Sequence, residues 1–241
     1  MLGKCFKYDM KAYARTFVPI LIIYSATELL TGLFERSTMK ADAVLGSLVA
    51  IFVIPMQVIS MMLAVFSILI IGAMRYNEVF FSDKAYLMRT LPVSGRIQFI
   101  SILINTIFWL FITVATVFGF SMIDSHSMFS TLARAFIRNY NSKEVLNTLF
   151  YTSSSFLFTQ MLLMLAVFMA SRMRINRTAA VIVCYFALNM ILSLFISVFL
   201  VAASKTGYEG YYNVYYAVKL IIAIVIMVFL TVVSENKVDL E

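Results

Sequence analysis

The sequence predicts an all-α membrane protein with six transmembrane helices. Of its 241 residues, 62% are hydrophobic and only 13% are charged, whereas a soluble domain carries about 25% charged residues. A helix needs roughly 20 mostly apolar residues to cross a bilayer, because its backbone polar groups must all be hydrogen-bonded within the segment. Six stretches meet this requirement. With three Pro and eight Gly, the chain has few of the turn residues that a β architecture needs.

Residues 1–16 predict an amphipathic helix in the membrane interface. Basic residues recur there at spacings of three and four and share one face, and apolar residues recur in the same way on the other face. The basic face carries Lys4, Lys7, Lys11 and Arg15, and the apolar face carries Leu2, Phe6, Met10, Tyr13 and Phe17. Such a helix would turn its cations toward anionic headgroups. The alternative is a charged cytosolic extension of the first span.

Six apolar segments follow, at approximately 17–34, 48–71, 97–120, 150–170, 179–203 and 214–233. Pro19 is expected near the start of the first segment, where proline is tolerated, and Pro55 is expected to kink the second. The sequence contains no internal repeat and no long polar linker. We therefore divide the chain into the interfacial helix 1–16 and one six-helix membrane domain, 17–241.

The distribution of basic residues predicts the orientation. With the N-terminus inside, cytoplasmic pieces hold twelve of the nineteen Lys and Arg residues and the opposite side holds six. The positive-inside rule then places both termini in the cytoplasm, in agreement with an even number of spans. The longest connections are the cytoplasmic loop 75–96 and the external loop 121–149. The net charge of +7 follows from this pattern, and the scattered basic residues do not predict a nucleic-acid partner.

Sequence motifs of several enzyme classes are absent. The chain contains no G-x-x-x-x-G-K-[ST], no H-E-x-x-H, no G-x-S-x-G and no intramembrane Asp pair. It therefore lacks the parts for cradling nucleotide phosphates and for membrane protease chemistry. The single histidine, His126, is expected to be an ordinary residue of the external loop. We expect that the chain is not an enzyme and holds no metal or cofactor of its own.

Few charged residues fall inside the predicted spans. Glu28 and Lys219 lie near the outer ends of the first and last spans, where they could snorkel or pair, contact a substrate, or couple an ion. Tyr208, Tyr211, Tyr212, Tyr215 and Tyr216 share one helix face, as an aromatic belt or as an external gate. The residues of a possible substrate path or gate are Glu28, Asn105, Asn189, Tyr212, Tyr216 and Lys219.

The loop after the second span reads RYNEVFFSDKAYLMRTLPVS from Arg75 to Ser94. Asp83 can cap a short helix that runs to Thr90, and Pro92 ends it because the residue before a proline is disfavoured in the helical region. Ser94 can then cap the third span. The loop thus predicts a short amphipathic helix on the cytoplasmic face, suited to press against a soluble partner.

This loop resembles the cytoplasmic loop of permease subunits of type-2 ABC transporters from Gram-positive bacteria, which reads in outline R-F-Y-x-x-L-F-x-D-E-G-Y-L-x-x-T-L-P-V-S. The matching residues are Arg75, Phe81, Asp83, Tyr86, Leu87, Thr90, Leu91, Pro92, Val93 and Ser94. The opening MLGKCFKYDMK and the closing NKVDLE also resemble the ends of that family, so the resemblance covers essentially the whole chain. Lys84 and Ala85 depart from the usual Glu-Gly.

The resemblance implies a type-2 ABC permease fold in which 83–91 contains the coupling helix that docks into a separate ATPase subunit. Residues 1–16 would be the elbow helix, and 171–178 would make a smaller contact. The implied coupling residues are Asp83, Lys84, Tyr86, Leu87, Arg89, Thr90, Leu91, Arg172, Arg174 and Arg177. The three arginines are equally consistent with a positive-inside anchor.

The implied function is that of the permease subunit of an ATP-driven exporter in a bacterial cell membrane. Two copies of an ATPase subunit would bind ATP and Mg, and a second permease, identical or a sister chain, would complete the path. The hydrophobic spans favour an amphiphilic cargo such as an antimicrobial peptide, a lipid-like molecule or a drug. The alternative is a stand-alone membrane immunity or scaffold protein that works without an ATPase.

Overall fold

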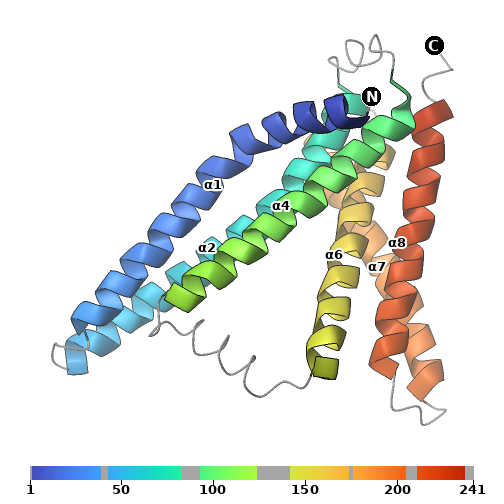
Figure 1. Ribbon diagram of the computed structural model, residues 1–241. Helices are drawn as coiled ribbons and strands as arrows, with labels where there is room; N and C mark the ends of the chain where they lie inside the picture. Colours follow the sequence, from blue (N-terminus) through green and yellow to red (C-terminus); the bar gives the residue numbers. More distant parts are fainter. Residues whose placement is uncertain are drawn as a thin grey trace. The chain divides into compact units, whose positions relative to one another are not determined.

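The computed structural model describes residues 2–38, 43–82, 93–123, 142–173, 176–204 and 211–236. These residues form six helices: α1 (Leu2–Thr38), α2 (Ala43–Phe80), α4 (Gly95–Ile123), α6 (Ser142–Ala170), α7 (Arg177–Ser204) and α8 (Tyr211–Asn236) (Figure 1). Each of the six is long and apolar enough to cross a membrane. The predicted all-α fold with six spans is confirmed, and the protein is a multi-pass membrane protein.

Helix α1 runs without a break through the predicted boundary between residues 16 and 17. In its first part, Lys4, Lys7 and Lys11 are exposed whereas Tyr13 and Phe17 are buried, which agrees with the two predicted faces at these five positions. A separate interfacial helix is thus not seen as an element of its own. The position of this part relative to a bilayer surface stays a prediction.

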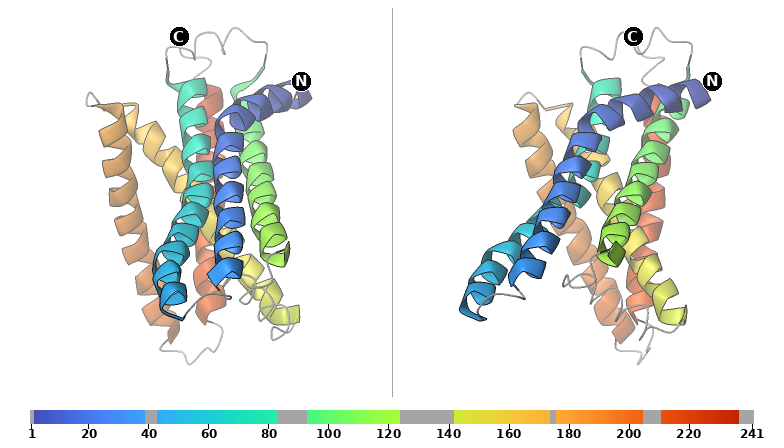
Figure 2. Two further views of the ribbon diagram at one scale, coloured as in Figure 1. Left: turned by 90° about the vertical axis from the view of Figure 1, so that its left-hand side faces the viewer. Right: turned by 60° about the vertical axis from the view of Figure 1, so that its left-hand side comes forward.

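The expectation that Pro19 lies near a helix start is wrong, because Pro19 is inside the 37-residue helix α1. The interfacial segment and the first span form one helix, so this proline falls in its interior. An interior proline removes one main-chain hydrogen bond and clashes with the preceding turn, which bends the helix. Figure 2 shows α1 bent, with its first part running across the direction of the remainder. Pro55 lies inside α2, as predicted.

Helix α2 continues further than the predicted loop 75–96 allows, since residues 75–80 are its last turns. Tyr76, Val79 and Phe80 are buried there, and Arg75 forms an i,i+3 ion pair of 3.1 Å with Glu78. Buried apolar residues and a helical ion pair both favour continuing the helix. At about 57 Å, the 38 residues of α2 exceed the roughly 30 Å of a bilayer core.

The chain divides into two compact units. The first unit comprises Met1–Cys5, Gly72–Leu103 and Lys143–Glu241, and the second comprises Phe6–Ile71 and Ile104–Ser142. Both long N-terminal helices and α4 therefore contribute to two units.

The core of the first unit is built around α6. In the most apolar stretch of α6, 56% of the residues are buried inside the protein, whereas in that of α7 the share is 17%. Tyr76, Phe99, Met164 and Leu230 are fully enclosed, and they come from α2, α4, α6 and α8 respectively. Because lipid is as apolar as these side chains, close van der Waals packing rather than removal from water stabilises such a core.

The second unit joins the first part of α1 to α4. The Tyr13 hydroxyl lies 2.8 Å from the Thr106 hydroxyl, and the rings of Phe17 and Trp109 meet edge to face at 5.4 Å. Both contacts involve buried side chains. An edge-to-face aromatic pair contributes about 0.5–1.5 kcal/mol beyond its buried area, so these contacts fasten the bent part of α1.

Candidate functional site

The segment that the resemblance assigns to the coupling helix, with Asp83, Lys84, Tyr86, Leu87, Arg89, Thr90 and Leu91, lies outside the described residues, as does Arg174. The structure describes the chain immediately before this segment, up to Ser82, and immediately after it, from Val93. The candidate site is therefore built from these two flanks and from the helices that contact them. All of these residues belong to the first unit.

The end of α2 is held by its own last turn. The amides of Phe81 and Ser82 both donate to the carbonyl of Asn77, at 2.9 and 3.0 Å. The Ser82 hydroxyl donates to the carbonyl of Glu78 at 2.6 Å. The final carbonyls of a helix have no partner within it, and these bonds satisfy two of the last ones. The C-terminal end of α2 is therefore capped by hydrogen bonds up to Ser82.

Phe81 connects this end to α6 and α7. Its ring centroid lies 6.1 Å from that of Phe168 in α6, and its carbonyl accepts a 2.8 Å hydrogen bond from Nη1 of Arg177 in α7. The Arg172 guanidinium lies 5.0 Å above the ring of the same Phe168. The two described arginines of the predicted coupling set therefore gather around the flank of the loop.

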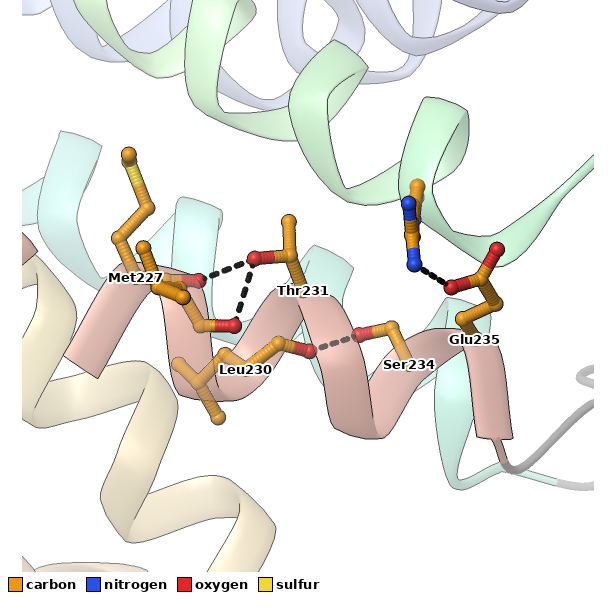
Figure 3. Close-up of polar contacts among 7 residues, drawn as sticks. Met227, Leu230, Thr231, Ser234 and Glu235 are labelled. Carbon is orange, nitrogen blue, oxygen red and sulfur yellow. Dashed lines mark hydrogen bonds and ion pairs between the residues drawn. The ribbon is translucent and has the colours of Figure 1, made fainter. Parts of the chain in front are cut away.

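The other flank leads into α4. Ser94 occupies the N-cap position, as predicted, since its carbonyl accepts from the amides of Ile97 at 3.0 Å and Gln98 at 3.3 Å. At the second residue of the helix, Arg96 forms an ion pair with Glu235 of α8 (Figure 3). The chain that enters α4 is therefore attached to the last turn of α8.

Along α8, Figure 3 also shows two hydroxyl groups that bond to main-chain carbonyls. Thr231 donates to the carbonyls of Met227 and Val228, at 2.6 and 2.8 Å, and Ser234 donates to that of Leu230 at 2.6 Å. Such bonds satisfy polar side chains within an apolar helix without a partner from another element. Glu235 of this stretch bonds to another helix through its side-chain carboxylate.

We name Phe81, Arg96, Phe168, Arg177 and Glu235 the flank cluster. The side chains of Arg96 and Glu235 are 55% and 36% exposed, and an ion pair so exposed stabilises by only about 0–1 kcal/mol. Its main effect is to fix which helix ends lie together. Within the described part of the chain, Arg172 and Arg177 have no acidic partner.

Sequence reasoning missed Asn176, which starts α7. Its carbonyl accepts from the amide of Ala180 at 2.9 Å, and its Oδ1 accepts from the amide of Thr178 at 3.2 Å. Asparagine is among the favoured N-cap residues, so its place directly before the apolar run was an available signal. The cap fixes the position of the neighbouring Arg177.

The residues predicted for a substrate path fall in both units. In the second unit, Glu28 is buried and its Oε2 accepts a 2.7 Å hydrogen bond from Nε2 of Gln57. Asn105 is also buried, and its Nδ2 donates to the carbonyl of Phe6 at 3.4 Å, a contact that joins α4 to α1. In the first unit, Asn189 is half-buried in α7. A role in substrate passage stays a prediction for all three.

Lys219 lies among aromatic rings in α8. Its Nζ is 4.5 Å from the ring centroid of Tyr215 and 5.6 Å from those of Tyr216 and Phe158. The structure thus brings together two of the predicted path residues, Tyr216 and Lys219. Tyr212 belongs to α8, and its side chain is outside the description.

The described residues contain no group of three His, Cys, Asp or Glu side chains placed to hold a metal ion. Comparison of the chain with protein-family models, with curated proteins and with solved structures gives no match. The fold therefore defines the class of the protein, a six-helix multi-pass membrane protein.

Proposed function

We propose that this chain is the membrane-spanning permease subunit of an ATP-driven exporter of the type-2 ABC class. In this proposal both termini and the segment 83–92 lie on the cytoplasmic side of a bacterial membrane. Two ATPase subunits bind ATP and Mg and dock on that segment. The resemblance of residues 75–94 to the coupling loop supports this assignment, and the observation that carries it is the attachment of both flanks of the segment to other helices.

The flank cluster suits a segment that transmits force. Phe81 is bonded to α7 and packed on α6, whereas Arg96 is paired with α8. A displacement of the ten residues between the flanks would therefore be transmitted to α6, α7 and α8. Because packed helices move as rigid bodies, closure of the ATPase subunits would tilt the first unit as a whole.

A second permease subunit, identical or a sister chain, would complete the path. The spans carry few charges, and large apolar side chains cover the exposed faces of α7 and α8. These features favour an amphiphilic cargo such as a peptide, a lipid-like molecule or a drug. ATP hydrolysis would occur in the partner, since the sequence has no nucleotide-binding motif.

The test is co-purification. Tagged full-length chain, extracted in mild detergent from its native membrane, should bring down a soluble Walker-A protein and its ATP hydrolysis. Charge reversal by Arg89→Glu should reduce the bound ATPase several-fold. Lys205→Glu is the matched control and should leave the complex intact, because Lys205 lies in the connection between the predicted spans 179–203 and 214–233, which the basic-residue count places on the opposite side.

A second variant separates docking from transmission. Arg177→Gln removes the bond to the Phe81 carbonyl without altering residues 83–92. We expect the ATPase to remain bound while the stimulation of its hydrolysis falls. Arg172→Gln removes an equal charge but no main-chain bond, and should retain more of the stimulation. If the chain purifies alone after crosslinking in intact membranes, the exporter proposal fails and a stand-alone immunity or scaffold protein is favoured.

A further inference from the structure

We propose that Lys219 and the rings around it form a binding site for the acidic headgroup of a phospholipid. We name Phe158, Tyr215, Tyr216 and Lys219 the lysine cage. Its members come from α6 and α8 and all belong to the first unit. The exporter proposal does not depend on this site, and the site does not depend on an ATPase.

The cage surrounds a cation without neutralising it. Lys219 Nζ lies within 5.6 Å of three ring centroids, and each ring face attracts the ammonium through its quadrupole. A ring face, however, is no strong hydrogen-bond acceptor, and the ammonium has three N–H donors. In the described part of the chain no carboxylate lies within ion-pair distance of Lys219. Among the described residues, the positive charge of the site therefore has no counter-charge.

The depth of Lys219 indicates where that counter-charge would come from. The predicted last span, 214–233, begins at Val214, so Lys219 lies five residues inside it, about 7.5 Å along the axis. Helical side chains lean toward the N-terminus of their helix, which explains why the ammonium lies over the rings at i−3 and i−4. Lys219 thus reaches back toward the start of the span, where headgroups meet acyl chains.

The cage is braced before any ligand binds. Tyr216 stacks on Tyr151 of α6 with a centroid distance of 4.4 Å, and the Tyr151 hydroxyl donates to Oδ1 of Asn213 at 2.5 Å. These two contacts fix the beginning of α8 against α6. A site whose walls are already ordered loses less conformational entropy when it binds.

These observations favour a phosphate diester over other ligands. A buried or half-buried cation within a bilayer is costly unless it is compensated, and anionic phospholipids present phosphate at this depth. Aromatic side chains are also enriched at the membrane–water interface, because their apolar rings face the acyl chains. A zwitterionic lipid carries its own cation beside the phosphate and should bind more weakly.

The test uses the full chain in detergent micelles, titrated with phosphatidylglycerol or phosphatidylcholine and analysed by native mass spectrometry. We expect wild type to retain phosphatidylglycerol preferentially and Lys219→Gln to weaken that binding about fivefold. Lys219→Arg keeps both the charge and the ring contacts and should bind like wild type. Arg96→Gln is the charge-matched control, since its guanidinium is already paired with Glu235, and should also bind like wild type.

A photo-crosslinking phosphatidylglycerol on the wild-type chain covers the case in which Lys219→Gln does not fold. Labelled peptides should come from 151–158 of α6 and 213–219 of α8. The proposal is overturned if Lys219→Gln binds phosphatidylglycerol as tightly as wild type. It is equally overturned if wild type shows no preference between the two lipids, or if the label maps to other helices.

Discussion

Two buried glutamines of this protein should respond in opposite directions to the same substitution. Gln57 and Gln160 are each 1% exposed, and each lies inside a membrane-spanning helix. Nε2 of Gln57 donates to the carboxylate of Glu28 at 2.7 Å. Neither amide atom of Gln160 has a hydrogen-bond partner in the described part of the chain. Methionine matches glutamine closely in shape and helix propensity, so Gln→Met removes the amide and little else.

The expected magnitudes follow from what each amide contacts. A buried polar group without a partner costs about 1–3 kcal/mol, and hydrogen bonds within membrane proteins contribute about 0.6 kcal/mol on average and at most about 1.7. Gln160→Met should therefore raise the free energy of unfolding by about 1 kcal/mol. Gln57→Met should lower it by about 1–2 kcal/mol, because it removes a donor from a buried carboxylate. The two variants should thus differ by at least about 2 kcal/mol.

Reversible unfolding of the full chain in mixed micelles, with increasing fractions of dodecyl sulfate, measures both values on one scale. Combining Gln57→Met with Glu28→Gln should reduce the loss, because a neutral amide suffers less from the missing donor. The reasoning is refuted if Gln160→Met destabilises the protein by more than about 1 kcal/mol, since its amide must then have a polar partner in the membrane. Equal effects at both positions would refute it as well.

Three further outcomes can be measured by similar means. Arg96→Glu should lower the thermal midpoint slightly, and the exchanged pair Arg96→Glu with Glu235→Arg should restore it, since their interaction contributes at most about 1 kcal/mol; a lack of recovery would show that the pair does not form. Phe168→Leu should cost about 1–2 kcal/mol in the dodecyl sulfate titration, because two ring contacts and one cation–π contact are lost. Pro19→Ala should straighten α1 and shift the emission of Trp109, the single tryptophan of the chain; an unchanged spectrum would contradict the bend as its cause.

The six helices could be predicted because length and apolar composition alone decide whether a segment can cross a bilayer. The residues at which these helices begin and end were harder to predict. Residues 75–80 have the charged and polar composition of a loop, yet they continue α2 because Tyr76 and Phe80 pack into the core of the first unit. Likewise, the sequence of α1 predicted two elements, since its pattern changes from amphipathic to apolar near Phe17. A helix tolerates such a change without ending.

The candidate site could be predicted only as a location. The motif from Arg75 to Ser94 predicted the position of the loop, and the preference of serine for N-cap positions predicted the cap at Ser94. The hydrogen bond from Arg177 to the Phe81 carbonyl could not be predicted. Every residue has a main-chain carbonyl, so the sequence does not indicate that the one 96 positions away is the acceptor. Arginine counts indicate a side of the membrane, whereas partners depend on how the helices pack.

The partner of Glu28, by contrast, follows from helix geometry once α1 and α2 are taken as an antiparallel hairpin. Glu28 lies ten residues before the end of α1, and Gln57 lies fourteen residues after the start of α2. The offset of four residues is about 6 Å along the axis. Side chains lean toward the N-terminus of their own helix, so in an antiparallel pair they lean in opposite directions. Glu28 leans away from the turn and Gln57 leans toward it, which closes the offset and permits the 2.7 Å bond. The same offset with the two residue positions reversed would separate the two groups. For a buried carboxylate on the first helix of such a hairpin, a polar partner on the second helix is therefore expected about one turn farther from the connection.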